Sequence, residues 1–254
     1  MGTPYRRIDP SSRAGRWMAD VPTFSQPLLY RDDVLAVVAK PSGLVVHRGW
    51  ARDPVVAMSL ARDAVGRRVY PVHRLDRGTS GVLVFALDPE TARHLQQQFE
   101  DRRVDKRYLA LVRGAPPESG VIDHPLAPTK SRERLPAVTE FRRLGVSGRY
   151  ALVEARPRTG RLHQVRRHLK HISCPLIGDV RYGKGEHNRW FRENHRLHRL
   201  ALHAFELSLD HPLTGERRRF RAEVPEDLAG PLAALGFDVD SCGWDLERQR
   251  AASS

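Results

Sequence analysis

The chain has 254 residues, enough for one large domain or two small ones, and 40% of them are hydrophobic, so a substantial core can form. Lys and Arg number 43 against 30 Asp and Glu, and the formal net charge of +13 predicts a polyanionic partner, most simply nucleic acid. The two cysteines, Cys174 and Cys242, exclude a disulfide framework and fit a reducing compartment such as the cytoplasm. No apolar run approaches the roughly 20 residues of a membrane span, so we expect no membrane partner.

The chain is expected to contain one large domain between two tails. Residues 1–26 carry four arginines and no apolar core, which favours a flexible basic tail over a secretory signal. Residues 27–237 show no internal repeat and no convincing linker, so we expect one domain there. Residues 238–254 are then a C-terminal tail.

The first half of the chain alternates short apolar runs with helical patterns. We expect two short strands around a turn in residues 28–47, a helix over 55–65, a strand over 82–87 and a helix over 89–100. The second helix has the clearest start, because Asp88 is a good N-cap and Pro89 fits the first helical position.

The second half of the chain predicts mainly strands. We expect strands over 106–112, 137–141, 150–155 and 205–209, a long loop rich in Pro and charge over 115–136, and a helix over 161–172. Apolar and polar residues alternate over 205–209, which predicts a half-buried strand. Strands outnumber helices and short turns join several of them, so we expect an α+β fold with a mostly antiparallel or mixed sheet.

One carboxylate stands out in the segment His73-Arg-Leu-Asp-Arg-Gly-Thr-Ser-Gly81. Asp76 lies between Arg74 and Arg77, and an acid flanked by cations is held ionised. Such a group can act as a nucleophile or as an electrostatic anchor. By itself, however, this segment is more typical of a solvated surface turn.

The helix predicted over 161–172 places one arginine at the border of its apolar stripe. At about 100° per residue, the stripe is formed by Leu162, Val165, Leu169 and Ile172. Arg166 lies about 40° from Leu162 on the same wheel. An unpaired buried charge is costly, so Arg166 is a candidate partner for a buried carboxylate. The alternative is that its guanidinium reaches solvent along the edge of the stripe.

Basic residues surround the start of this helix. Arg161, His163 and Arg167 extend a cationic surface that suits phosphate contact, with a solvated basic face as the alternative. The histidines lack zinc-site spacing, and the chain contains no phosphate-binding Gly-rich loop and no Gly-x-Ser-x-Gly elbow. We therefore expect no metal and no cofactor.

Three segments in order resemble the RluA family of pseudouridine synthases. They are His73–Gly81, Lys106–Val112, and Arg158–Arg166 running on to Pro175–Asp179. The resemblance spans residues 28–237. It implies an α+β fold with a mixed, largely antiparallel central sheet, flanking helices and a basic central cleft. It also implies an isomerase that converts a uridine of RNA to pseudouridine without a cofactor, and we expect a monomer.

The resemblance also implies roles for individual residues. Asp76 matches the catalytic aspartate, Tyr108 the aromatic residue against the target base, and Arg166 the salt-bridge partner of the aspartate. Arg74 matches the arginine that fills the space left by the flipped base. The further RNA- or base-binding residues are expected to be His73, Arg77, Thr79, Arg161, His163, Gln164 and Arg167.

Finer features resemble the tRNA pseudouridine synthase C branch. They are Val46–Trp50, Arg77 directly after the aspartate, and Gly183–Asn188. The branch implies a uridine in the T-stem of tRNA, at tRNA position 65, as the target. We expect no S4 RNA-binding domain, because only about 27 residues precede the expected domain. Two alternatives remain open: large-subunit ribosomal RNA as the substrate, and a non-catalytic RNA-binding or RNA-folding protein on the same scaffold.

Overall fold

The computed structural model describes residues 28–48, 53–128 and 133–239. Among these residues the strands are β1 (Tyr30–Arg31), β2 (Leu35–Lys40), β3 (Tyr70–Pro71), β4 (Ser80–Ala86), β5 (Asp105–Arg113), β6 (Ser119–Asp123), β7 (Val138–Ser147), β8 (Tyr150–Pro157), β9 (Leu202–Asp210) and β10 (Arg217–Arg221). They form one sheet in the order β1-β2-β4-β9-β5-β8-β7-β6, with β10 beside β9 and β3 beside β4. Only the pairing of β4 with β9 is parallel in this part of the chain, so the predicted mixed, largely antiparallel sheet is confirmed.

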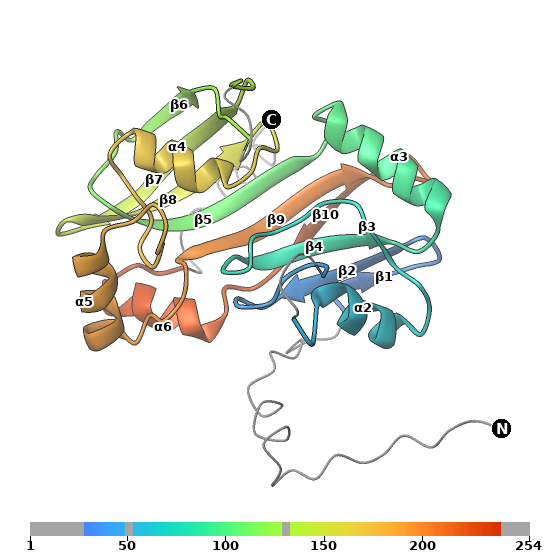
Figure 1. Ribbon diagram of the computed structural model, residues 1–254, viewed down its shortest axis with the longest axis horizontal. Helices are drawn as coiled ribbons and strands as arrows, with labels where there is room; N and C mark the ends of the chain where they lie inside the picture. Colours follow the sequence, from blue (N-terminus) through green and yellow to red (C-terminus); the bar gives the residue numbers. More distant parts are fainter. Residues whose placement is uncertain (1–27, 49–52, 129–132, 240–254) are drawn as a thin grey trace, which may run out of the picture.

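Helices cover both faces of the sheet (Figure 1). They are α2 (Ala57–Val65), α3 (Pro89–Glu100), α4 (Gln164–His171), α5 (Gly185–His195) and α6 (Glu226–Ala234). The predicted start of α3 is confirmed, because Asp88 Oδ1 accepts a hydrogen bond of 2.8 Å from Thr91 N. None of the described helices is long and apolar enough to cross a membrane.

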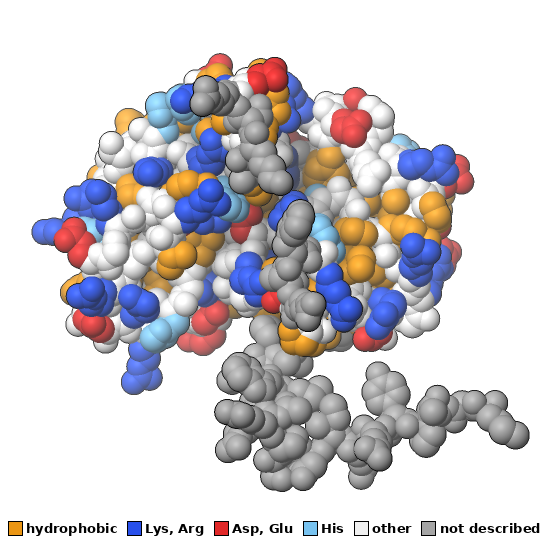
Figure 2. Space-filling model, viewed as in Figure 1, with side chains coloured by type: hydrophobic (Ala, Val, Ile, Leu, Met, Phe, Trp, Pro, Cys, Tyr) orange, Lys and Arg blue, Asp and Glu red, His pale blue; other side chains and the backbone are white. Residues whose placement is uncertain are grey.

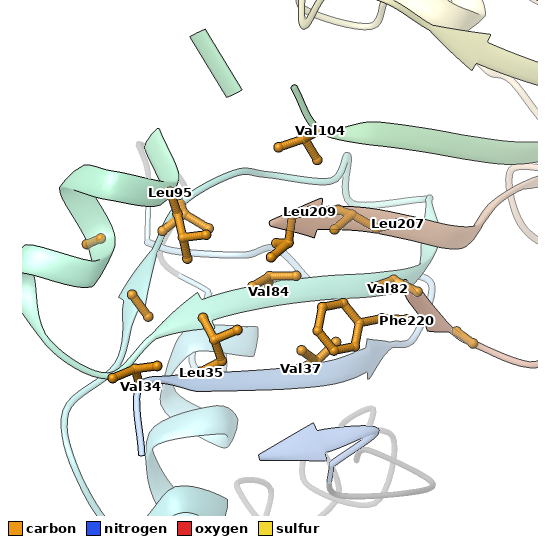
Figure 3. Close-up of a cluster of buried hydrophobic side chains, with 14 residues drawn as sticks. Val34, Leu35, Val37, Val82, Val84, Leu95, Val104, Leu207, Leu209 and Phe220 are labelled. Atoms are coloured by element: carbon orange, nitrogen blue, oxygen red, sulfur yellow. The ribbon is translucent and has the colours of Figure 1, made fainter. Parts of the chain in front are cut away.

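The core divides into clusters on the two halves of the sheet. On the β2–β4 half, α3 covers one face through Leu95, which packs near Leu35 and Val84 (Figure 3), while α2 covers the other face. On the β5–β8 half, α4 covers one face, and α5 and α6 cover the other. Tyr108 packs against both the α2 cluster and the α4 cluster, so this residue lies where the two halves meet.

Several predicted elements differ from the structure. Residues 44–46 form no strand, and β6 lies inside the segment predicted as a long loop, 115–136. The helix predicted over 161–172 begins only at Gln164, because His163 adopts a left-handed backbone with φ of 53°. Strand β9 is buried on both faces, not half-buried, and its Glu206 is paired with Arg107 and Arg221 from the adjacent strands.

The two halves of the sheet join at a short parallel contact that also fixes the loop before β4. Ser80 pairs with His203, and Gly81 pairs with Ala204. Gly81 has φ of 119°, and a Cβ there would lie 2.1 Å from the carbonyl oxygen of Ala204. Only glycine permits this approach. The segment carrying Asp76 therefore ends at the junction between the two halves.

The expected tails fall largely outside this structure. Residues 1–26 and 240–254 lie outside the described residues, as do Gly49 and Trp50 of the segment Val46–Trp50. The proposed boundaries of the domain therefore stay predictions.

Candidate active site

A cavity of about 750 Å³ lies between the loop before β4, the start of α4 and strand β5. This volume falls within the range of about 300–1,000 Å³ that is usual for ligand sites. Asp76, Tyr108 and Arg166 all line it. Cations outnumber carboxylates in the lining of this cavity. The carboxylates are Asp76 and Glu100, and the cations are Arg74, Arg102, Lys106, Arg161, Arg166 and Arg167. Figure 2 shows Lys and Arg side chains in both the left and the right part of the face in view.

The turn that carries Asp76 is held by the end of β2 and the segment that follows it. Lys40 is 1% exposed, and its Nζ donates hydrogen bonds to the carbonyls of Leu44 (2.7 Å) and Arg77 (3.3 Å). Ser42 Oγ donates to the carbonyl of Gly78 at 2.8 Å. Burial, helped by nearby arginine charges, lowers the pKa of Lys40 to about 7. The turn is therefore fixed directly after the aspartate by the buried amine of Lys40 and the hydroxyl of Ser42.

Arg166 joins Asp76 to a second, fully buried carboxylate. Arg166 NH1 donates to Asp76 Oδ2 at 2.9 Å, while Nε and NH2 donate to the two oxygens of Asp179 at 2.7 and 3.0 Å. Burial disfavours the guanidinium, but the hydrogen bonds and charges of Asp179 and Asp76 outweigh it and hold the pKa of Arg166 above its ordinary value. The planar fork of arginine suits this double contact. Asp76 thus faces a permanent cation across a hydrogen bond of 2.9 Å.

A bulge in β9, opposite Arg107 and Tyr108 of β5, affects the position of Tyr108. The pairing of β5 with β9 passes from Arg107–Glu206 to Tyr108–Ala204, so one residue of β9 is skipped. Bulges of this kind re-aim a side chain locally. Burial and the charge of Asp76 raise the pKa of the Tyr108 hydroxyl. The hydroxyl is therefore protonated at neutral pH and can donate a hydrogen bond beside the aspartate.

Four of the predicted RNA-contacting residues offer cationic or polar groups at the cavity or its rim. Arg74 is exposed, lines the cavity and has no ion pair within the described part of the chain. Arg161 and Arg167 also line it, and Arg167 NH1 donates to the carbonyl of Ala127 at 2.9 Å. His163 Nε2 lies 3.7 Å from Asp76 Oδ1.

The other four have their polar atoms turned to the protein or lie apart from the cavity. Gln164 is 4% exposed, and its amide holds the backbone of Arg161 and Val138. His73 Nε2 accepts from the backbone of β4, and burial lowers its pKa to about 3. Arg77 lies outside the cavity lining and pairs with Asp53 through two contacts of 2.8 Å.

Thr79 is the last of the four predicted RNA-contacting residues in this second group. It is 2% exposed and lines the cavity, but its hydroxyl oxygen has no hydrogen-bond partner among the described residues. These geometries describe positions and leave the RNA-binding roles of all eight residues as predictions.

Sequence reasoning missed four residues that shape the site. They are Lys40, Lys106, Asp179 and Tyr182. The strand period could have indicated Lys106, since it shares a face of β5 with Tyr108. Burial lowers the pKa of Lys106 to about 8, and its Nζ donates to the carbonyl of Thr159 at 3.3 Å. Asp179 is the last residue of the segment Pro175–Asp179 named above, but only the fold shows that it binds Arg166.

No metal centre is found in the described ranges. No group of three or more His, Cys, Asp or Glu side chains there could hold a metal ion.

Comparison with known proteins defines the class. The family model described as RNA pseudouridylate synthase matches residues 34–171. The human protein "RNA Pseudouridylate Synthase Domain Containing 4" has a similar structure, with a TM-score of 0.70 and 30% identity, covering 84% of this chain and 94% of that one. The chain therefore belongs to the RNA pseudouridylate synthase family, and the RluA resemblance is confirmed.

Within that family the chain is similar to enzymes named tRNA pseudouridine synthase C. It is 39% identical to that of Vibrio cholerae, over 83% of this chain and 96% of the relative. It is 41% identical to that of Pectobacterium carotovorum, over 83% of this chain, and the matched region spans 62% of that relative's length. The chain is accordingly an isomerase of the pseudouridine synthase class.

Proposed function

We propose that this protein converts a uridine in the T-stem of tRNA to pseudouridine, with Asp76 as the essential catalytic residue. The observation that carries the proposal is the pairing of Asp76 with Arg166 at the wall of a basic cavity. The similarity to two proteins named tRNA pseudouridine synthase C favours tRNA over ribosomal RNA.

The reaction needs no oxidation or reduction, because product and substrate are isomers. The bond between N1 of uracil and C1′ of the ribose breaks, the base turns, and C5 joins C1′. C5 then gives up its proton and N1 takes one up, so the numbers of atoms and electrons do not change. A base within an RNA helix must first be flipped out of the stack. The cavity then receives the base, Tyr108 lies against its ring, and Arg74 occupies the space left in the helix.

Two chemistries are open to Asp76. Its carboxylate attacks the base or sugar as a nucleophile, or it removes a proton from the sugar. Both require the ionised form, which Arg166 stabilises. Asp76 Oδ2 is bound by Arg166, whereas Oδ1 has no hydrogen bond within the described residues and lies 3.7 Å from His163 Nε2, which leaves Oδ1 for the reaction.

The test compares Asp76→Asn with the unchanged protein on tRNA transcripts. We expect tRNA binding to be retained and pseudouridine formation to fall by about 10³-fold or more, the scale of a lost acid–base group. Undiminished pseudouridine formation by the variant would contradict the proposal. If Asp76→Asn rescued every effect of losing the protein in cells, that result would instead favour a non-catalytic RNA-binding protein.

A second measurement separates the two RNA substrates. Pseudouridine is mapped in total RNA from cells with and without the protein. We expect one T-stem position of tRNA to lose its signal. Loss at a large-subunit ribosomal RNA position, with tRNA unchanged, would assign the enzyme to ribosomal RNA.

A further inference from the structure

The loop between β8 and α4 brings a strained histidine against the second oxygen of Asp76. His163 precedes the first residue of α4 with φ of 53°, a left-handed conformation that few residues other than glycine adopt. Strain of this kind persists where the surrounding structure enforces it, and it is common in active sites. His163 Nε2 lies 3.7 Å from Asp76 Oδ1, on the side that Arg166 does not occupy.

Tyr182 holds the other side of the imidazole. The hydroxyl of Tyr182 lies 3.1 Å from His163 Nδ1. Two tautomers satisfy this contact, but they present different groups to the aspartate. If Nδ1 carried the proton, a lone pair on Nε2 would face the negative carboxylate. The charge of Asp76 therefore favours the tautomer in which Tyr182 donates to Nδ1 and Nε2–H points to Asp76 Oδ1.

The same tyrosine also supports the other partner of Asp76. The guanidinium of Arg166 lies over the ring of Tyr182, 5.1 Å from its centroid. Asp179, which binds Arg166, also accepts a hydrogen bond of 3.0 Å from the backbone of Tyr182. One short loop after α4 thus fixes both groups that face the catalytic carboxylate.

This loop is itself rigidly tied. A Cβ on Gly183 would lie 2.4 Å from the carbonyl oxygen of Asp179, so the turn closes only around glycine. From α5, Asn188 Nδ2 donates to the carbonyl of Asp179 at 3.0 Å, and Asn188 Oδ1 accepts from the backbone of Gly178 at 2.8 Å. The segment Gly183–Asn188 therefore fixes the loop from outside.

The geometry points to His163, held by the Tyr182 hydroxyl, as a second positioning residue for Asp76, acting on the oxygen that Arg166 leaves unbound. This inference rests on the proposed function, since it assigns a role around the same aspartate. A distance of 3.7 Å is too long for a hydrogen bond. A shift of less than about 1 Å by the carboxylate towards His163 closes it. The imidazole thus fixes the direction of Oδ1 when substrate is bound.

Variants of His163 distinguish this positioning role from a direct contact of His163 with RNA. His163→Asn keeps a residue that tolerates the left-handed backbone but removes the N–H that reaches Asp76. A positioning role predicts that kcat falls about tenfold while KM for tRNA changes less than about twofold, the scale of one hydrogen bond. His163→Gln, whose longer amide restores a donor near Nε2, is expected to recover part of kcat.

Tyr182→Phe isolates the hydroxyl, because the ring under Arg166 is kept. We expect kcat to fall about threefold in the single variant, less than one full hydrogen bond. In the His163→Asn background, Tyr182→Phe should have no further effect, because its hydroxyl acts through the imidazole. The matched control is Tyr150→Phe, which removes the hydroxyl of a second Tyr–His pair, Tyr150 with His187 at 3.0 Å, neither of which lines the cavity.

The outcomes separate the possible failures. Independent, multiplicative effects of the two substitutions, or a rise in KM with kcat unchanged, would overturn the inference and return His163 to RNA contact. Equal losses in Tyr182→Phe and Tyr150→Phe would mark a general effect on folding, also against it, and thermal melting of each variant measures that effect. If Asp76→Asn alone retained full activity, the proposed function itself would fail, whatever the His163 result.

Discussion

Two buried arginines, Arg166 and Arg107, are each shared by two carboxylates, and they lie in opposite settings. Arg166 joins Asp76 and Asp179 at the cavity, whereas Arg107 joins Glu154 and Glu206 in the sheet. Glu154 is 0% exposed, and both of its oxygens are bound, because Arg142 and Arg156 also donate to it. A saturated cluster of this kind has no atom left for chemistry.

Asp76 lines the cavity and differs in having one oxygen bound by arginine and one without a hydrogen bond among the described residues. Arg166 donates a single hydrogen bond to it and uses its other two contacts on Asp179. The second carboxylate thus anchors the arginine, and the arginine in turn binds one oxygen of the first. Incomplete pairing of an ionised group, not the presence of an ion pair, distinguishes the site from the structural cluster.

The largest expected effect follows from breaking the shared contact at the cavity. Arg166→Lys offers one compact ammonium, which cannot bind Asp179 through two atoms and also reach Asp76. We expect kcat to fall by about 1,000-fold, equivalent to about 4 kcal/mol of the buried pairing, with tRNA affinity largely kept. Single-turnover kinetics on tRNA transcripts measures the loss. A decrease below tenfold would show that Asp76 needs no such partner.

Breaking the saturated cluster should affect stability and leave chemistry unchanged. Glu154→Gln removes the charge on which Arg107, Arg142 and Arg156 converge, and we expect the free energy of unfolding to fall by about 3 kcal/mol. The kcat of the folded variant should stay within about twofold of the original. Glu140→Gln is the matched control, because Glu140 pairs with Arg158 at the exposed surface and its loss should cost less than about 1 kcal/mol. Urea denaturation of both variants compares the two costs, and equal costs would contradict this reading of the cluster.

The same cluster predicts a pH dependence of stability. Burial raises the pKa of Glu154, but hydrogen bonds and charges of Arg107 and Arg156 outweigh it and lower the pKa from 4.5 to about 2. The folded state therefore binds a proton at Glu154 less readily than the unfolded chain. Its stabilisation is complete above about pH 4.5 and is lost as the pH falls toward 2. Unfolding measured across this range should show a shallower acid dependence in Glu154→Gln, and an unchanged slope would exclude Glu154 as its source.

Local signals in the sequence predicted α3 well and the ion cluster not at all. Asp88 and Pro89 define the start of α3 without help from distant residues. Glu206 alternates with apolar neighbours and was expected to face solvent, yet it is 4% exposed because Arg107 and Arg221 from adjacent strands bind it. Strand pairing decides such burial, and strand pairing is not visible in a local pattern.

The candidate site shows the same division. The segment around Asp76 and the helical wheel of Arg166 could be read from the sequence, as could the resemblance that joins them. The contact of Tyr182 with His163 could not be read from the sequence, because the two residues lie 19 positions apart and only the fold brings them together. Helix α5 was also missed, since its residues are mostly polar and its three buried ones, His187, Asn188 and Phe191, form no long apolar stripe.

The smallest expected effect separates the two arginines that flank Asp76. Arg74 lines the cavity without an ion pair in the described ranges, whereas Arg77 is bound to Asp53 by both terminal nitrogens. A guanidinium already paired to a carboxylate has less to gain from a phosphate, so Arg74→Ala should weaken tRNA binding more than Arg77→Ala. If Arg74 contacts one phosphate, its loss also lowers the slope of log K against log salt by about 1. Binding titrations between about 50 and 200 mM salt measure both slopes. A larger change for Arg77→Ala would reverse the assignment and place RNA on the Asp53 side of the turn.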